Sequence, residues 1–336
     1  MEWRDLERLP QATEGAWEAR RIGGRLIRGK AAVDAAVARW NLLDPLMVSP
    51  PGSARFVPVL HVEEYCHRAH RALLRKHAVS FAILLGTALL LVVSGYVAER
   101  PKALHAALMA FALALFIAVD YQLVLRRIEA LRERALFILW VCRAGILHAL
   151  LALGLMTVAG GLQLYVARRI GGQTPLLEAY GAVRAFVADE PWRIVAGPFL
   201  HGSLAHWLTN VAMLVAANAI AGPLMRGPHA LALLLCGSTF GALVSLLVEA
   251  TAPMDVYLGV SGGIFALFGW CVGAAIRRPA LFPTGFAVTA AAFALLNLAA
   301  APLGSANVSH AGHIGGLALG ALIGLAFPPR CRGTPG

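Results

Sequence analysis

Between residues 79 and 328 the sequence contains eight apolar segments, each near the roughly 20 residues that a helix needs to cross a bilayer. Their period is helical, and a helix satisfies its backbone polar groups internally, as lipid demands. The short alternating strands of a β-barrel are not visible. The sequence therefore predicts an all-α polytopic membrane protein. The expected spans are residues 79–98, 103–125, 144–167, 205–225, 229–250, 260–276, 281–300 and 310–328.

The amino-acid composition excludes several other classes of protein. Of 336 residues, 59% are hydrophobic and 14% are charged, against roughly 25% charged in an ordinary soluble domain. A soluble enzyme of common composition and a disordered chain are both excluded. The five cysteines are scattered without a CxxC pair, so neither a zinc knot nor a disulfide framework is indicated. We predict no cofactor and no metal.

The net charge of +11 is explained by basic residues kept on one side of a membrane rather than by a nucleic-acid partner. With the N-terminus placed inside, fourteen Lys and Arg residues flank the spans inside and six flank them outside. The inside set is Arg68, Arg71, Arg75, Lys76, Arg126, Arg127, Arg132, Arg134, Arg143, Arg226, Arg277, Arg278, Arg330 and Arg332. The outside set is Arg100, Lys102, Arg168, Arg169, Arg184 and Arg193. Both termini are therefore predicted to be cytoplasmic, with the long connection 168–204 outside. The start of the sequence has no apolar leader, and its acids argue against a mitochondrial transit peptide, so we expect a bacterial inner membrane.

The first 78 residues are the most polar part of the chain, with nine of its eighteen acids. We predict a cytoplasmic segment over 1–78, with an amphipathic helix over 60–76 running into the first span. Cys66, His67 and His70 lie within one helical turn of each other. A metal site there is one alternative, and a chance surface grouping is the expected interpretation. Two additional helices (79–128), a six-helix core (144–328) and a cytoplasmic tail (329–336) complete the predicted organisation.

Polar residues inside apolar segments are costly in lipid and mark functional positions. Three clusters stand at helix ends that the predicted topology places on the outer side: 201–210 with two histidines and Asn210, 259–263, and 309–313. A fourth cluster, 191–193, lies in the long outer loop. Each alone is compatible with interhelical hydrogen bonding or a water-filled cavity. Asp120, inside the second span, is expected to reach towards Arg126 and Arg127 at the inner face.

The sequence Gly259-Val260-Ser261-Gly262-Gly263 fits the G-x-S-x-G pattern of a nucleophilic serine. No Asp or Glu follows Ser261, so a triad in the order Ser, acid, His is impossible. A Ser-His pair is chemically sufficient, because a histidine within hydrogen-bond reach can take the serine proton and return it to the leaving amine. His206 and Asn210, four apart on one helix face, together with the Ser261 N–H, are candidate oxyanion donors.

Small residues at intervals of three or four positions can bring a histidine on the last helix close to this serine. They form one ladder on residues 310–328 and a second on residues 260–276, and two such faces allow unusually close backbones. Phe265, four residues after Ser261, lies on the serine's face and is expected to stack on the imidazole. The two ladders are Gly312, Gly316, Gly320 and Gly324, and Gly262, Ala266, Gly269 and Gly273.

Taken together, residues 144–328 resemble the rhomboid family of intramembrane serine proteases. The resemblance rests on His-x4-His-x3-Asn, G-x-S-G, an aromatic residue four after the serine, His-x-x-Gly, and Trp-Arg in the first outer loop. The residues that carry these motifs are His201, His206, Asn210, Gly259, Ser261, Gly262, Phe265, His313, Gly316, Trp192 and Arg193. Residues 1–78 and the spans 79–98 and 103–125 depart from the simplest six-helix rhomboids.

The resemblance implies an endopeptidase with Ser261 as nucleophile and His313 as general base and acid. It implies His206 and Asn210 as oxyanion donors, and His201, Trp192 and Arg193 as structural positions around the site. Its partners would be the lipid bilayer and transmembrane protein substrates, cleaved near the outer face. His310 does not correspond to the family's base, because only His313 is followed three residues later by a glycine, Gly316, that continues the ladder. His310 is kept as a rival base. In the family the helix corresponding to 281–300 is discussed as a gate, and Pro283-Thr284-Gly285 could loosen its start.

Three other functions remain open. An inactive rhomboid-like chaperone or binding protein would lack the serine or the histidine. A transporter would be expected to carry an inverted repeat and polar residues at the midplane. A zinc protease would need an H-E-x-x-H motif, which the sequence does not contain. The oligomeric state does not follow from the sequence.

Overall fold

The structure is a computed structural model that describes all residues except 1, 7–8, 14, 98–100, 226–227, 250–251, 253, 305–308 and 330–336. The predicted tail 329–336 therefore lies almost entirely outside the described residues. The same holds for four of the basic residues in the orientation count, Arg100, Arg226, Arg330 and Arg332.

The chain divides into two compact units, which are described separately. The N-terminal unit comprises Met1–Arg143 together with Pro279–Thr289. The core unit comprises Ala144–Arg278 and Ala290–Pro329. The short connection 279–289 therefore packs with the N-terminal unit although it joins two helices of the core.

The N-terminal unit contains a small antiparallel sheet that the sequence analysis did not predict. Its strand order is β2-β1-β3-β4. The strands are β1 Glu18–Arg21, β2 Ile27–Arg28, β3 Leu46–Ser49 and β4 Val57–Pro58, with helix α1 Lys30–Ala38 between β2 and β3. Strands of two to four residues are too short to show a hydrophobic period, which is why the sequence pattern indicated only a polar segment.

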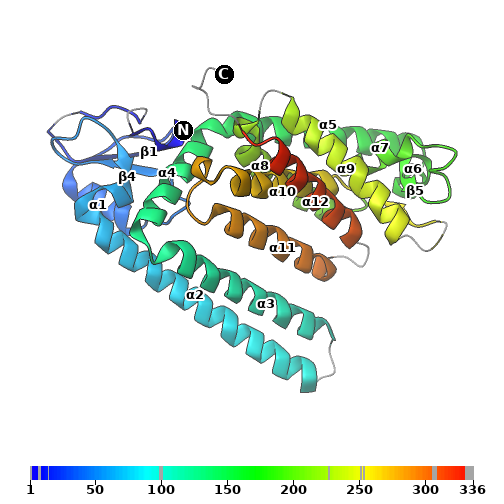
Figure 1. Ribbon diagram of the computed structural model, residues 1–336, viewed down its shortest axis with the longest axis horizontal. Coiled ribbons are helices and arrows are strands. Elements are labelled where there is room, and N and C mark those ends of the chain that lie inside the picture. The colour runs from blue at the N-terminus through cyan, green and yellow to red at the C-terminus, as the bar shows by residue number, and fades with distance from the viewer. Residues whose placement is uncertain are drawn as a thin grey trace. The chain divides into compact units, whose positions relative to one another are not determined.

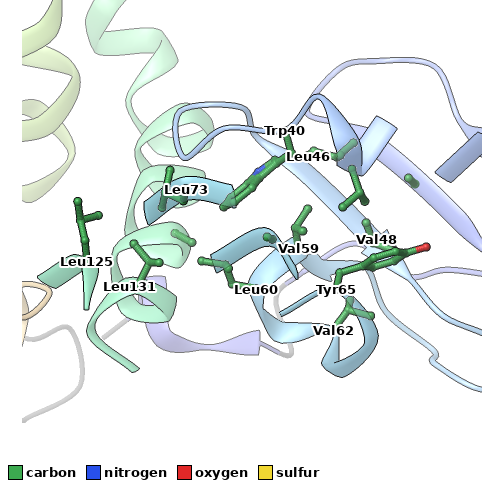
Figure 2. Packing of buried hydrophobic residues seen from close by; sticks show 14 of the residues in the cluster. Trp40, Leu46, Val48, Val59, Leu60, Val62, Tyr65, Leu73, Leu125 and Leu131 are labelled. Atoms are coloured by element: carbon green, nitrogen blue, oxygen red, sulfur yellow. The ribbon is translucent and has the colours of Figure 1, made fainter. Parts of the chain in front are cut away.

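This sheet has its own hydrophobic core. Trp40, Leu46 and Val48 are packed with Leu60 and Tyr65, and all five are almost fully buried (Figure 2). Leu73, Leu125 and Leu131, from the helical part of the unit, belong to the same cluster. The segment 1–78 is therefore a folded element that packs onto the helices following it.

Helices α2 Glu63–Val97 and α3 Pro101–Asp120 lie side by side as a hairpin (Figure 1). The first turns of α2 bury Tyr65, Cys66, Ala69 and Leu73, so an amphipathic beginning runs directly into an apolar span as predicted. A metal site is not supported there. His70 Nε2 donates to the Leu125 carbonyl (2.6 Å) and Arg132 donates to Cys66 Sγ (3.3 Å). Among the described residues no group of three or more His, Cys, Asp or Glu is placed to hold a metal ion.

A π-helical turn, Tyr121–Leu125, ends α3 and leads to α4 Ile128–Ala144, a helix that was not predicted. The expectation for Asp120 was wrong for this reason. Asp120 is 8% exposed and pairs with Arg134 of α4 (2.7 Å), not with Arg126 or Arg127. Arg134 also donates to Thr289 Oγ1 (3.1 Å). The buried Asp120 carboxylate is therefore paired with a cation that is itself hydrogen-bonded.

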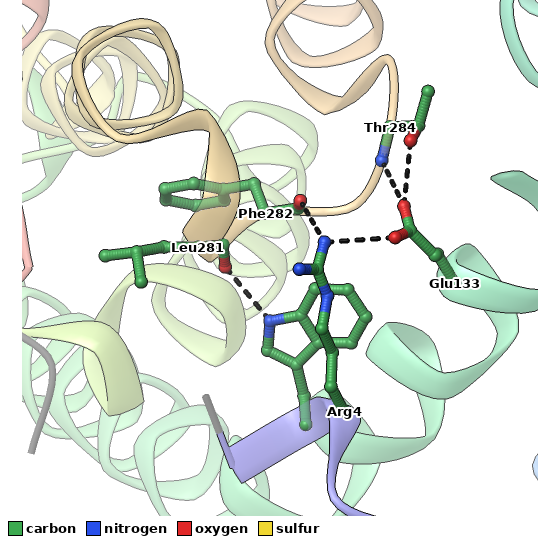
Figure 3. Close-up of polar contacts among 6 residues, drawn as sticks. Arg4, Glu133, Leu281, Phe282 and Thr284 are labelled. Carbon is green, nitrogen blue, oxygen red and sulfur yellow. Dashed lines mark hydrogen bonds and ion pairs between the residues drawn. The ribbon is translucent and has the colours of Figure 1, made fainter.

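Residues at the start of the chain hold the connection 279–289 within the same unit (Figure 3). Trp3 Nε1 donates to the Leu281 carbonyl (3.0 Å), and Arg4 bridges Glu133 (3.0 Å) and the Phe282 carbonyl (3.5 Å). The other oxygen of Glu133 accepts from the backbone and side chain of Thr284 (3.0 and 2.8 Å). The connection is thus fixed by both polar and aromatic contacts, since Phe282 also lies near Phe137.

The core unit contains the remaining helices and a two-stranded sheet. Its long helices are α5 Ile146–Arg169, α8 Leu204–Leu224 and α9 His229–Val248, and its shorter ones are α6 Gln173–Tyr180, α7 Arg193–Ala196, α10 Ser261–Arg277 and α12 His310–Ala326. α11 Phe286–Gly304 begins in the N-terminal unit and continues into the core. Strands β5 Ala182–Val183 and β6 Val256–Tyr257 pair antiparallel.

Five described helices are long and apolar enough to cross a membrane: Glu63–Val97, Ala103–Leu125, Ile146–Arg169, Leu204–Leu224 and His229–Val248. The protein is thus an integral membrane protein. The last three predicted spans are shorter than the expected 20 residues, since the apolar helices there are Ser261–Arg277, Phe286–Ala299 and His310–Ala326. For α10 the physical reason is visible in its burial. From Gly262 to Ala275 nearly every residue is buried in protein, so its length need not match the lipid.

Glycines set the close approach of α10 and α12. A Cβ atom on Gly316 would collide with the Gly262 carbonyl oxygen, and one on Gly320 with that of Ala266. Further along the two helices, a Cβ on Gly269 would collide with the Leu317 backbone, one on Gly273 with the Ala321 backbone and one on Gly324 with the Trp270 backbone. The predicted meeting of two small-residue faces is present. Gly312 differs, because it faces Tyr257 and Gly241 rather than α10.

Candidate active site

Ser261 is the first residue of α10 and follows a sharp turn. Gly259 has φ +94°, a left-handed conformation that favours glycine. The amides of Gly263 and Ile264 both donate to the Val260 carbonyl (3.0 and 3.1 Å). The Ser261 N–H has no acceptor within the helix, as is general for the opening residues of a helix. The turn therefore presents both the hydroxyl and a backbone donor at the positive end of α10.

His313 lies in the first turn of α12, and its Nε2 is 2.7 Å from Ser261 Oγ. Ser309 caps this helix, since its hydroxyl accepts from the Gly312 N–H (2.9 Å). The imidazole is 7% exposed. Two residues that are 52 positions apart in sequence are thus brought into hydrogen-bond contact by the α10–α12 crossing. The imidazole that reaches Ser261 belongs to His313 rather than to His310.

The ring of Phe265 is stacked on the His313 imidazole, with ring centres 4.5 Å apart and planes 21° from parallel. Phe265 is one turn after Ser261 and is 5% exposed. The stack limits rotation of the imidazole about its side-chain bonds.

His206 and Asn210 lie against Gly259, two residues before the serine. Their Nε2 and Nδ2 atoms are 2.6 and 3.3 Å from the position that a Cβ on Gly259 would occupy. Ser203 caps α8 by accepting from the His206 N–H (3.2 Å), and Asn210 Nδ2 donates to the His206 carbonyl (3.1 Å). The second amide hydrogen of Asn210 is not used in that bond. The structure therefore places a ring nitrogen and an amide nitrogen beside the serine turn, where glycine alone leaves them room.

His201 supports His206 rather than reaching the serine. The two rings meet edge to face with centres 5.2 Å apart. His201 is 3% exposed, and burial, followed by the neighbouring His206, lowers its pKa to about 4, so the ring is neutral at pH 7.

The backbone of His201 is held by two glutamines that sequence reasoning missed. Gln163 of α5 donates to the His201 carbonyl (2.7 Å) and accepts from the His201 N–H (3.0 Å). Gln173 of α6 donates to the same carbonyl (2.7 Å). Gln163 is 9% exposed within an apolar span, and this isolated polar residue was the signal that could have found it.

Trp192 and Arg193 lie between α6 and α8, where Trp192 is the N-cap and Arg193 the first residue of the short helix α7. Arg193 is buried, pairs with Glu190 (2.6 Å) and donates to the carbonyls of Glu178 (2.8 Å) and Gly181 (3.2 Å). Trp192 is 45% exposed and touches Tyr180 edge to face. Arg193 thus holds the loop together, and neither side chain is among those at the serine.

A cavity of about 520 Å³ opens beside α5 and α8 and is lined by Gln163, Gln173, His201, Leu204 and Trp207 among others. Ser261 and His313 are not among its lining residues. The hydrogen-bonded pair therefore lies apart from this hollow.

Residues 188–330 match the family model of the Rhomboid domain. This segment of the chain is therefore similar to the rhomboid family. The match covers α7 to α12, and α5, which the sequence analysis included in the core, precedes it. No curated protein matches the chain. The rhomboid domain thus contains both the Ser261 turn and the His313 helix.

Proposed function

We propose that this protein is a rhomboid-type intramembrane serine endopeptidase in which Ser261 and His313 form the catalytic dyad. The observation that carries the proposal is the 2.7 Å contact between Ser261 Oγ and His313 Nε2 at the ends of two tightly crossed helices. It is supported by the geometry that a nucleophile and its base require.

In the proposed acylation step, Ser261 Oγ attacks the carbonyl carbon of the scissile peptide bond while His313 Nε2 takes the hydroxyl proton. A new C–O bond forms and the carbonyl oxygen becomes an oxyanion. Collapse of this intermediate breaks the C–N bond, and the imidazolium donates its proton to the leaving amine. The product is an acyl-enzyme on Ser261 and a released peptide amine.

Deacylation repeats these transfers with water. His313 takes a proton from the water as its oxygen attacks the ester carbon. The ester C–O bond then breaks, and the proton moves to Ser261 Oγ, which restores the hydroxyl. The second product leaves as a carboxylic acid, so atoms and charge balance over one hydrolysis.

The oxyanion would be stabilised by the Ser261 N–H, by Asn210 and by His206. Donors of this kind, placed where negative charge develops, are each worth roughly 10²–10³ in rate. Gly259 supports the assignment, because any side chain there would displace His206. Gly316 has a supporting role through the close α10–α12 contact, and Gly262 through its close approach to Gly237, Gly241 and Tyr257.

The proposed substrates are transmembrane segments of other membrane proteins, presented from the lipid and cleaved near the outer face. The proposed location is a bacterial inner membrane, with cytoplasmic termini, two additional helices and a six-helix core.

α11 begins only at Phe286, after Pro283-Thr284-Gly285, so that break precedes the helix instead of interrupting it. Gly285 has φ +78° at this point.

The test compares purified wild-type protein with Ser261→Ala, His313→Ala and His310→Ala. A fluorophosphonate probe should label the wild type and the His310 variant, and neither of the other two. The wild type and the His310 variant should also cleave a model transmembrane substrate, and the Ser261 and His313 variants should not. Labelling of a Ser261→Ala protein at the wild-type rate, or a His310 variant as inactive as the His313 variant, would overturn the assignment. A folded wild type that neither reacts with the probe nor cleaves would favour the inactive binding protein.

A further inference from the structure

No acid among the described residues contacts the His313 imidazole to orient it. Its Nδ1 atom is buried and has no hydrogen-bond partner within the part of the chain that the structure describes. The ring is held on one side by Phe265 and at Nε2 by Ser261. Its remaining placement depends on the backbone of the first turn of α12.

One carboxylate holds that turn. Glu249, the C-cap residue directly after α9, accepts from the Ser309 hydroxyl with Oε2 (2.6 Å) and from the Ala311 N–H with Oε1 (2.7 Å). Both of its oxygens are therefore used on the two sides of His310, within four residues of His313. Its own N–H donates to the Ser245 carbonyl (2.8 Å), which fixes Glu249 to the last turn of α9.

The chemistry of this contact is specific. The opening N–H groups of a helix have no intrahelical acceptor, and a negative charge is favoured beside them. Hydrogen bonds to an ionised carboxylate are stronger than neutral ones. The Ser309 hydroxyl donates to Glu249 and accepts from Gly312, so it is held in one orientation. Glu249 is also the only acid in the predicted span 229–250.

Tyr257 limits how else the turn could pack. Its ring is 3% exposed, and it lies against Gly312, so closely that a Cβ there would be 2.7 Å from Tyr257 Cε2. Gly241 of α9 faces the same glycine through its carbonyl. The start of α12 is thus confined by contacts from α9 and β6, with Glu249 supplying the charged link.

We propose that Glu249 is a positioning residue that holds the first turn of α12 so that His313 meets Ser261. The inference rests on the proposed function, because it assigns a role in that same dyad. Glu249 acts through Ser309 and Ala311 and contacts neither the substrate nor the reacting atoms. It supplies, through the helix backbone, the orientation that an acidic triad member would give directly.

The experiment measures the rate of fluorophosphonate labelling of Ser261 in the full-length protein. The variants are Glu249→Ala, Glu249→Gln and Glu249→Asp, with thermal melting measured on each. Glutamine keeps the shape and one acceptor, so it should label about threefold or more slowly, and alanine about tenfold or more slowly, because small displacements of a base are costly. With a transmembrane substrate the loss should appear in kcat, with KM within about twofold.

Three further variants separate positioning from a general loss of charge. Glu178→Gln removes an exposed carboxylate of the core whose backbone carbonyl, not its side chain, accepts from Arg193. It should label at the wild-type rate. Ser309→Ala should slow labelling, and Ser309→Thr, which keeps the hydroxyl, should restore most of it.

The outcomes are distinguishable. If folded Glu249→Gln and Glu249→Asp both label and cleave at the wild-type rate, Glu249 does not position His313, while the proposed protease function stands. If the variants melt lower but keep full labelling at low temperature, the contact is only structural and the inference is wrong. If wild-type protein itself is unreactive, it is the proposed function that fails.

Discussion

The ring of Phe265 is stacked on the imidazole of His313 at 4.5 Å, one helical turn after the serine that the same imidazole contacts. A single turn of α10 therefore supplies both a hydrogen-bond partner and a flat apolar surface for one ring. Neither contact requires a carboxylate, so a Ser-His pair can be oriented by packing where an acid is absent.

Phe265→Ala should lower the rate of Ser261 labelling by about tenfold, because the imidazole gains rotational freedom and its alignment is lost. Phe265→Tyr keeps the aromatic face and should retain most of the rate. Both rates are measured with a fluorophosphonate probe on protein whose melting is checked separately. Equal rates for the alanine variant and the wild type would show that the stack does not orient the base.

Gly316→Ala should destabilise the core, because the new Cβ would collide with the Gly262 carbonyl oxygen and force α10 and α12 apart. Overpacking of this kind costs about 1–3 kcal/mol. Gly154→Ala is the matched control, since that glycine is also in a helix and a Cβ there meets nothing within 4 Å. The control should melt at or slightly above the wild-type temperature, because alanine favours a helix. Similar melting of both variants would contradict the packing argument.

Gln163→Leu should destabilise the turn before α8. The change leaves the buried N–H of His201 without its acceptor, and an unpaired buried polar group costs about 1–3 kcal/mol. Gln173→Leu removes only a second donor to a carbonyl that Gln163 still serves, so its effect should be smaller. Thermal melting ranks the two variants, and a larger loss for Gln173→Leu would contradict the assignment.

The contacts of the candidate site could be predicted because its motifs are short stretches of sequence and its glycines recur at a regular spacing. The serine turn, the histidines and the glycine ladder all lie at fixed spacings, and the structure brings Ser261, His313, Phe265 and Gly316 together as the spacing indicates. Domain limits and membrane orientation remain predictions.

The sequence pattern did not reveal elements that lack a clear hydrophobic period. The strands of the N-terminal sheet are too short to alternate visibly. α4 mixes five charged residues with its apolar ones: Glu129, Arg132, Glu133, Arg134 and Arg143. Because α4 was missed, the partner of Asp120 was misassigned. Glu249 was overlooked because its bond partners, Ser309 and Ala311, lie about 60 residues later in the chain.

Glu133→Ala should release the connection 279–289 from the N-terminal unit. Glu133 accepts from Arg4 and from both donors of Thr284 (Figure 3). Its bonds to Thr284 are a polar link between α4 and that connection, in addition to the bond from Arg134 to Thr289. Hydrogen exchange over 279–289 should become faster, since the Thr284 amide loses its acceptor. Glu129→Ala is the control, because the ion pair of Glu129 among the described residues lies within α4, with Arg132 (2.9 Å). Faster exchange in the control alone would contradict the assignment.

His61 should make the N-terminal unit sensitive to acid. Burial, with the nearby Arg132 adding to it, lowers the pKa of His61 from 6.5 to about 4, so the folded state favours the neutral ring. The stabilisation is present above pH 6.5 and is lost as the pH falls towards 4, which amounts to about 2 kcal/mol between pH 7 and pH 5. His61→Gln cannot titrate, so the free energy of unfolding of this unit should fall less steeply with pH in the variant. Parallel curves for the two proteins would show that His61 keeps an ordinary pKa when folded.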